Sequence, residues 1–119
     1  MTARSKAFTR LSRLTASGEF ARVFAGAERS TDRFFTVLAR LNDLARARLG
    51  LAISRKVARH ATDRNRLRRL TRESFRHLSH APLDYVVMAR ADAVAAENSV
   101  LRASLDRHFE RLSRRAGAS

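Results

Sequence analysis

Two neighbouring segments of the chain carry most of the information about its fold. Residues 48–54 read RLGLAIS, and residues 63–77 read DRNRLRRLTRESFRH. The first segment alternates large apolar with small side chains, which is typical of a β-strand that buries one face. The second repeats apolar residues at helical spacing, and Pro82 ends that region because proline cannot continue a helix. The pair predicts a strand followed by an amphipathic helix, from Asp63 to His77 or slightly beyond.

Strand patterns also occur before and after this pair. Residues 34–41 predict a strand that places Phe35, Val37, Ala39 and Leu41 on one face. The short polar link that joins it to residues 48–54 is typical of an antiparallel hairpin. Residues 85–89 read YVVMA, a short apolar run of the buried-strand type. The chain therefore contains at least three predicted strands.

Helix signals stand near both ends of the chain. Ser17 is placed to cap a short helix that carries Phe20 and Phe24 on one side and ends near Gly26. Asn98 is placed to cap a last helix, whose apolar stripe consists of Leu101, Leu105, Phe109 and Leu112. These two helices flank the predicted strands and the central helix.

The order of these elements predicts an α+β two-layer sandwich, with helices packed on a small sheet. Residues 17–115 form one domain. Residues 1–16 carry four basic residues and no acid, so they form a basic N-terminal arm, and residues 116–119 are a tail that is expected to fray.

The net charge is the unusual feature of the composition. The 119 residues include 25 Lys or Arg against 11 Asp or Glu, which gives +14, while the 45% hydrophobic content is ordinary for a globular chain. A sequence pI near 11.9 indicates a polyanionic partner, either nucleic acid or an anionic membrane surface. Only Lys6 and Lys56 are lysines. The arginine excess reflects either bidentate phosphate recognition or a GC-rich genome.

Several classes of protein and site are excluded or disfavoured. There is no cysteine, so disulfides, thiol catalysis and cysteine zinc sites are excluded. No apolar run approaches the roughly 20 residues of a membrane span, and no signal peptide is apparent, so a cytoplasmic location is expected. The histidines are scattered, the carboxylates are not clustered, and no glycine-rich phosphate loop occurs. We expect no catalytic residue and no metal ligand in the protein itself.

Half of the net charge lies in residues 55–77. The nine basic residues there are Arg55, Lys56, Arg59, Arg64, Arg66, Arg68, Arg69, Arg72 and Arg76, against only Asp63 and Glu73. On the helix, Asn65 and four of these arginines fall opposite the apolar side. Like charges four residues apart repel each other, and a bound polyanion would relieve this repulsion. The alternative interpretation is a merely solvated basic face.

A second candidate surface lies on the predicted strands. Phe34, Thr36, Leu38, Ala52 and Ser54 share one face, with Phe20 and Phe24 expected nearby. Small side chains beside aromatic rings can bind single-stranded nucleic acid by stacking. From periodicity alone, the alternative is that the two phenylalanines belong to the core.

Residues 54–57, SRKV, and residues 64–76, RNRLRRLTRESFR, resemble the protein subunit of bacterial ribonuclease P. The resemblance extends to EFARVF at residues 19–24, to the strand at residues 48–54, and to DYVVMAR at residues 84–90. It covers about residues 10–113. It implies an αβββαβα fold with a small mixed sheet, a left-handed βαβ crossover and an additional short strand near Ala27 to Thr31.

The resemblance also implies a function. The family enzyme is a ribonucleoprotein that removes the 5′ leader from precursor tRNA, and its RNA subunit carries the active site and binds most of the Mg²⁺. The protein would contact ribonuclease P RNA through Arg55, Lys56, Arg59, Arg64, Asn65, Arg66, Arg68, Arg69, Arg72 and Arg76. It would contact the leader through Phe20, Phe24, Thr36, Leu38, Ala52 and Ser54. The competing readings are a structural RNA-binding protein, such as a small ribosomal protein, and a stand-alone hydrolase.

Overall fold

The computed structural model describes residues 26–42, 44, 46–78 and 82–117. The elements are β1 (Glu28–Thr31), β2 (Phe35–Leu41), β3 (Arg48–Ala52), α2 (Ala61–Leu78), β4 (Leu83–Ala89), a 3₁₀ helix (Ala91–Ala93) and α3 (Asn98–Gly117). The predicted basic arm and the first helix with Phe20 and Phe24 lie outside the described residues. No helix among the described residues is both long and apolar enough to cross a membrane.

The four strands form one mixed sheet in the order β1-β2-β4-β3. β4 pairs antiparallel with β2 and parallel with β3, so β2 and β3 are not neighbours. The predicted hairpin of these two strands is therefore wrong. The polar link between them spans one strand position, a distance of roughly 10 Å that a few extended residues can cover. The parallel neighbours β3 and β4 are joined through α2, and β1 is the additional short strand that the family resemblance implies.

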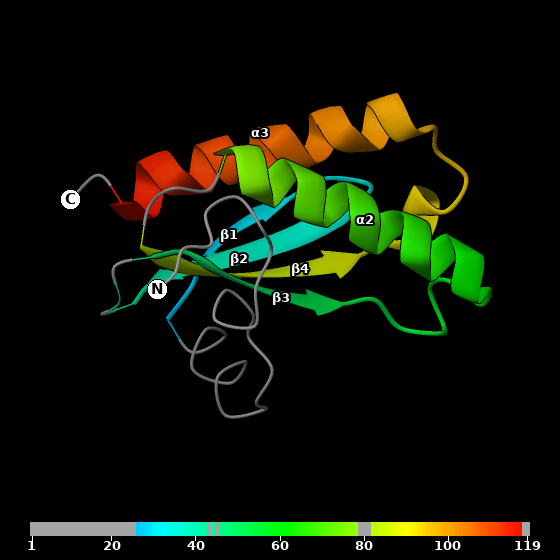
Figure 1. Ribbon diagram of the computed structural model, residues 1–119, viewed down its shortest axis with the longest axis horizontal. Helices are drawn as coiled ribbons and strands as arrows, with labels where there is room; N and C mark the ends of the chain where they lie inside the picture. Colours follow the sequence, from blue (N-terminus) through cyan, green and yellow to red (C-terminus); the bar gives the residue numbers. More distant parts are fainter. Residues whose placement is uncertain (1–25, 43, 45, 79–81, 118–119) are drawn as a thin grey trace, which may run out of the picture.

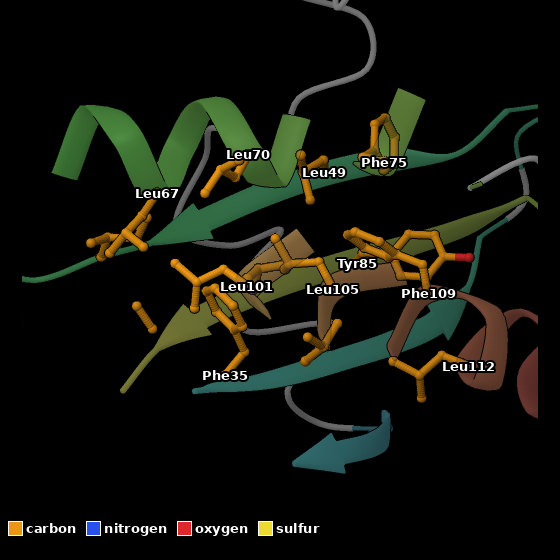
Figure 2. Close-up of a cluster of buried hydrophobic side chains, with 14 of the residues drawn as sticks. Phe35, Leu49, Leu67, Leu70, Phe75, Tyr85, Leu101, Leu105, Phe109 and Leu112 are labelled. Carbon is orange, nitrogen blue, oxygen red and sulfur yellow. The ribbon is translucent and has the colours of Figure 1, made fainter. Parts of the chain in front are cut away.

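Helices α2 and α3 both lie on one face of the sheet, as Figure 1 shows. The core between the layers takes residues from both helices and from three strands (Figure 2). Its centre is an edge-to-face aromatic trio in which the ring of Tyr85 lies 5.2 Å from that of Phe109 and 6.1 Å from that of Phe75. Such pairs add to the stabilisation from burial alone.

The sequence periodicity predicted the buried sides of both helices. In α2 the buried residues are Leu67, Leu70, Thr71, Ser74 and Phe75, and in α3 all four residues of the predicted apolar stripe are buried. The α3 helix runs through Gly117, so Ala116 and Gly117 belong to the helix and not to the expected tail.

A buried ion pair joins β3 to β4. Arg48 donates from Nε and Nη2 to the two carboxylate oxygens of Asp84, both at 2.8 Å, and Asn42 Nδ2 donates to Oδ1 at 2.8 Å. The side chains of Arg48 and Asp84 are only 13% and 5% exposed. This bidentate geometry fixes the parallel register at the start of both strands.

A second polar network joins β1 and the turn after it to α3. His108 Nδ1 lies 2.7 Å from Ser30 Oγ, and His108 Nε2 lies 3.2 Å from Asp32 Oδ2. Asp32 also accepts hydrogen bonds from the Ser104 hydroxyl and from two backbone amides, those of Phe34 and Phe35. Burial lowers the pKa of His108, and this outweighs the opposing effect of Asp32. His108 is therefore held neutral.

The pKa of Asp32 is lowered to about 2. Burial alone would raise it, but the hydrogen bonds from Ser104, Phe35 and Phe34, together with the nearby His108, favour the ionised carboxylate more strongly. At neutral pH this network therefore contains an ionised Asp32 carboxylate and a neutral His108 imidazole.

Removing the Asp84 carboxylate should destabilise the fold strongly. The Asp84→Ala variant leaves the buried Arg48 guanidinium without its main counter-charge, so the free energy of unfolding should fall by about 3–5 kcal/mol in urea denaturation. The matched control is Asp92→Ala, since Asp92 pairs with Arg33 at 3.4 Å with both side chains largely exposed. That change should cost less than about 1 kcal/mol. Equal costs for the two variants would contradict the anchoring role of Asp84.

The network around His108 predicts a stability that falls in acid. The unfolded chain takes up a proton on His108 below about pH 6.5, whereas the folded state resists it, so the free energy of unfolding should fall from that pH downward. A further loss through Asp32 should follow as the pH falls from about 4 towards 2. In His108→Gln the slope of unfolding free energy against pH between 6.5 and 4 should be smaller. A wild-type slope in His108→Gln would refute the assignment.

Candidate nucleic-acid interface

The side of α2 that faces away from the core carries a row of basic residues. Arg69 and Arg76 are exposed, while Arg68 and Arg72 are half-buried. Asn65 is exposed, and its Oδ1 accepts a hydrogen bond of 3.4 Å from Arg68. The helix therefore has the basic face that the sequence predicted, and Asn65 belongs to it.

The turn between β3 and α2 presents further cations next to this face. The backbone amides of Val57 and Ala58 donate to the Ser54 carbonyl at 3.2 and 3.0 Å, and Ser54 Oγ also accepts from Val57 at 3.3 Å. This closes a tight turn and leaves the three basic side chains of the segment exposed; these are Arg55, Lys56 and Arg59. Together with Arg68, Arg69, Arg72 and Arg76 they form what we call the α2 basic surface.

Two arginines of the predicted contact set are used within the protein. Arg64 donates to the carbonyls of Ala58 and Arg59, both at 2.9 Å, and so holds the turn against the helix. Arg66 donates to the carbonyls of Val94 and Ala96 and to Asn98 Oδ1, at 2.7 to 3.2 Å. Arg66 therefore ties α2 to the segment that leads into α3, and Asn98 receives this contact at the start of that helix.

Two acidic residues, Glu73 of α2 and Asp106 of α3, are held between the two helices. Arg102 of α3 contacts Glu73 of α2 at 3.5 Å and Asp106 at 3.1 Å, and the Ser74 hydroxyl donates to Asp106 at 2.5 Å. Because Glu73 points toward α3, it does not neutralise the opposite side of α2. The α2 basic surface is left with a strong excess of positive charge.

The sheet face that the helices do not cover carries the second predicted site. Strand pairing places Thr36, Met88 and Ala52 in one row across β2, β4 and β3. The next row holds Leu38, Val86 and Gly50, with Leu38 and Val86 forming a small apolar cluster against which Met88 packs. We call these six positions the second sheet face; Ala52 is exposed and Met88 half-buried, whereas the other four are buried. The structure thus brings Thr36, Leu38 and Ala52 together.

Sequence reasoning missed Val86 and Met88 because it placed β2 directly beside β3. Alternate residues of a strand point to the same face, so Val86 and Met88 of residues 83–89 could have been assigned to this face if β4 had been placed between β2 and β3. Two predicted members of this face differ: Phe34 packs against the main core, and Ser54 lies beyond the end of β3, where it holds the turn. Phe20 and Phe24 lie outside the described residues.

One buried cluster among the described residues has the residue types of a catalytic triad. Ser30, His108 and Asp32 form a Ser–His–Asp arrangement that sequence reasoning missed, because 78 residues separate Ser30 from His108. Ser30 is only 3% exposed and His108 only 1%, and the Ser30 hydroxyl also accepts a hydrogen bond from Arg111. No substrate can reach this serine, so the arrangement is structural. In the described ranges, no three His, Asp or Glu side chains lie close enough to hold a metal ion.

Comparison with known proteins agrees with this geometry. A family model described as ribonuclease P matches residues 8–113. The chain is 52% identical over 115 residues to the ribonuclease P protein component of Methylococcus capsulatus, covering 94% of this chain and 89% of that protein. It is 50% identical over 108 residues to that of Thioalkalivibrio sulfidiphilus, covering 89% and 90%.

Solved structures show the same fold. The RNase P protein of Staphylococcus aureus superposes with a TM-score of 0.75 at 26% identity, covering 84% of this chain and 94% of that one. The RNase P protein of Thermotoga maritima gives a TM-score of 0.73 at 29% identity, covering 83% and 96%. With a family match over nearly its whole length, this chain belongs to the ribonuclease P protein family.

Proposed function

We propose that this chain is the RNA-binding subunit of a ribonuclease P ribonucleoprotein, and that it acts in removing the 5′ leader of precursor tRNA. The observation that carries the proposal is the α2 basic surface, in which seven cations come from one turn and from one face of the helix that follows it. The acidic residue of α2 nearest to them in sequence, Glu73, is held on the other side by Arg102. A surface with this excess charge fits a polyanion of defined shape.

The catalytic RNA is the proposed ligand of the α2 basic surface. Arginine forks bind phosphate oxygens in a bidentate manner, and each phosphate contact releases condensed counterions. Arg64 and Arg66 contribute differently, since their hydrogen bonds hold the turn and the helix in position beneath the exposed cations. Asn65 can add a neutral hydrogen bond to a sugar or base at the same surface.

The second sheet face is the proposed site of the single-stranded leader, as the family resemblance implies. Its accessible positions are Ala52, which is exposed, and Met88, which is half-buried against the apolar side chains of Leu38 and Val86. Such contacts are tolerant of base identity because every base has an apolar ring face. Phe20 and Phe24 remain proposed stacking partners by family resemblance.

Catalysis is proposed to reside in the RNA subunit. The Ser–His–Asp arrangement of the protein is buried. By the family resemblance, the Mg²⁺ ions would be held mainly by RNA phosphates. The protein's contribution is to neutralise repulsion between RNA segments and to position the leader, which should raise substrate and metal affinity.

Reconstitution with a bacterial ribonuclease P RNA tests this function. At low Mg²⁺, adding the full chain should restore cleavage of precursor tRNA at the mature 5′ end, since its cations replace part of the charge screening that Mg²⁺ supplies. Affinity for precursor tRNA should fall as the leader is shortened. RNA binding without either effect would instead indicate a structural RNA-binding protein, and cleavage by the protein alone would indicate a hydrolase.

The salt dependence of binding tests the α2 basic surface directly. The double variant Arg69→Gln/Arg76→Gln removes two exposed charges from it. The slope of log affinity for ribonuclease P RNA against log salt should become shallower by up to about 0.7–0.9 for each phosphate that is no longer neutralised. The single variant Arg90→Gln, exposed at the end of β4, is the control and should leave the slope unchanged. A wild-type slope in the double variant would rule out phosphate binding by these residues.

A further inference from the structure

Helix α3 carries a row of arginines that the α2 basic surface does not include. Arg107, Arg111 and Arg115 are four residues apart, so one stands on each successive turn, about 6 Å apart along the helix axis. Arg114 lies beside the row, and Arg107, Arg114 and Arg115 are all exposed. Like charges at this spacing repel each other and mildly destabilise the helix. A bound anionic ligand would relieve this repulsion.

Two of these arginines are fixed over the edge of the sheet by contacts with β1. Arg111 Nη1 donates to Ser30 Oγ at 2.7 Å, and Arg115 Nη1 donates to the carbonyl of Arg29 at 3.2 Å. Each contact uses a single nitrogen of a guanidinium group that has five N–H donors. The remaining donors are held in place, which lowers the entropy cost of binding a ligand. Arg29 itself is exposed on the same edge strand.

Two nearby carboxylates, Asp106 of α3 and Asp32 of the turn after β1, are paired elsewhere. Asp106 is held between the helices by Ser74 and Arg102, and Asp32 is held by His108 and Ser104. The five arginines then face only Glu28 and Glu110 as exposed acids among the described residues of this region. The helix dipole explains basic residues in the last turn of α3, but it does not reach Arg107, which lies well before that turn.

We propose that these five arginines, Arg29, Arg107, Arg111, Arg114 and Arg115, form a second RNA-binding surface, the α3 basic surface. It lies on the side of α3 toward β1, whereas the turn of the α2 basic surface follows β3, and β1 and β3 are the opposite edges of the sheet. The choice of RNA as ligand rests on the proposed function. The ligand group is a backbone phosphate, from either ribonuclease P RNA or precursor tRNA.

The test uses the full chain and the double variant Arg107→Gln/Arg114→Gln, whose two side chains are exposed. Binding is measured against salt with ribonuclease P RNA alone and, separately, with precursor tRNA alone. Each phosphate that the variant fails to neutralise should make the slope shallower by up to about 0.7–0.9, on whichever RNA supplies the phosphates. The control Arg33→Gln/Arg90→Gln removes the same charge from exposed positions outside both surfaces and should keep the slope.

Two further outcomes decide the proposal. The variant Arg107→Lys/Arg114→Lys keeps the charge and should keep the wild-type slope. The α3 basic surface is overturned if the glutamine variant keeps the wild-type slope on both RNAs, or if the control changes the slope equally. If the wild-type chain fails to restore leader cleavage while the glutamine variant still lowers the slope, the proposed function fails and the surface stands.

Discussion

Strand β4 is buried on both faces, and the rest of the fold follows from this constraint. Val86 and Val87 point to opposite faces of the sheet and are both fully buried, so β4 is covered on both of its faces. It is also paired along both of its edges. β2 and β3 supply the two neighbours, and the bidentate Arg48–Asp84 pair fixes the parallel register with β3. The return from β3 to β4 then requires a crossover, and this crossover is the basic helix α2.

The scarcity of carboxylates is the second organising constraint. A chain with a net charge of +14 can bury a cation only beside one of its few acids or a set of carbonyls. Asp84 forms an ion pair with Arg48 in the sheet, and Glu73 and Asp106 form ion pairs with Arg102 between the helices. Arg66 is satisfied by carbonyls and an amide instead. Because acids are drawn into these positions, the outer sides of both helices remain positively charged.

Local periodicity predicted the features that depend on nearby residues. The buried side of α2, its basic face and the apolar stripe of α3 all follow from 3.6-residue spacing, which one segment contains completely. Strand order does not follow from local periodicity, since it depends on β4 lying between β2 and β3. Because the predicted hairpin was wrong, Met88 and Val86 were not assigned to the same face as Thr36, Leu38 and Ala52. The roles of Arg66 and His108 were also hidden, because their partners lie about 30 and 78 residues away and charge counts carry no information about acceptors.

The position of the two basic surfaces follows from how the helices are joined. The contacts of Arg102 and Arg66 fix α2 against α3. The α3 basic surface lies toward β1, whereas the turn of the α2 basic surface follows β3 at the other edge of the sheet. Under the proposal, each surface therefore binds its own RNA segment. The second sheet face lies on the side of the sheet opposite α2 and α3 (Figure 1). An RNA strand bound there is separated by the sheet from RNA on the helix layer, so the two can approach each other only around an edge of the sheet, at β1 or at the turn after β3.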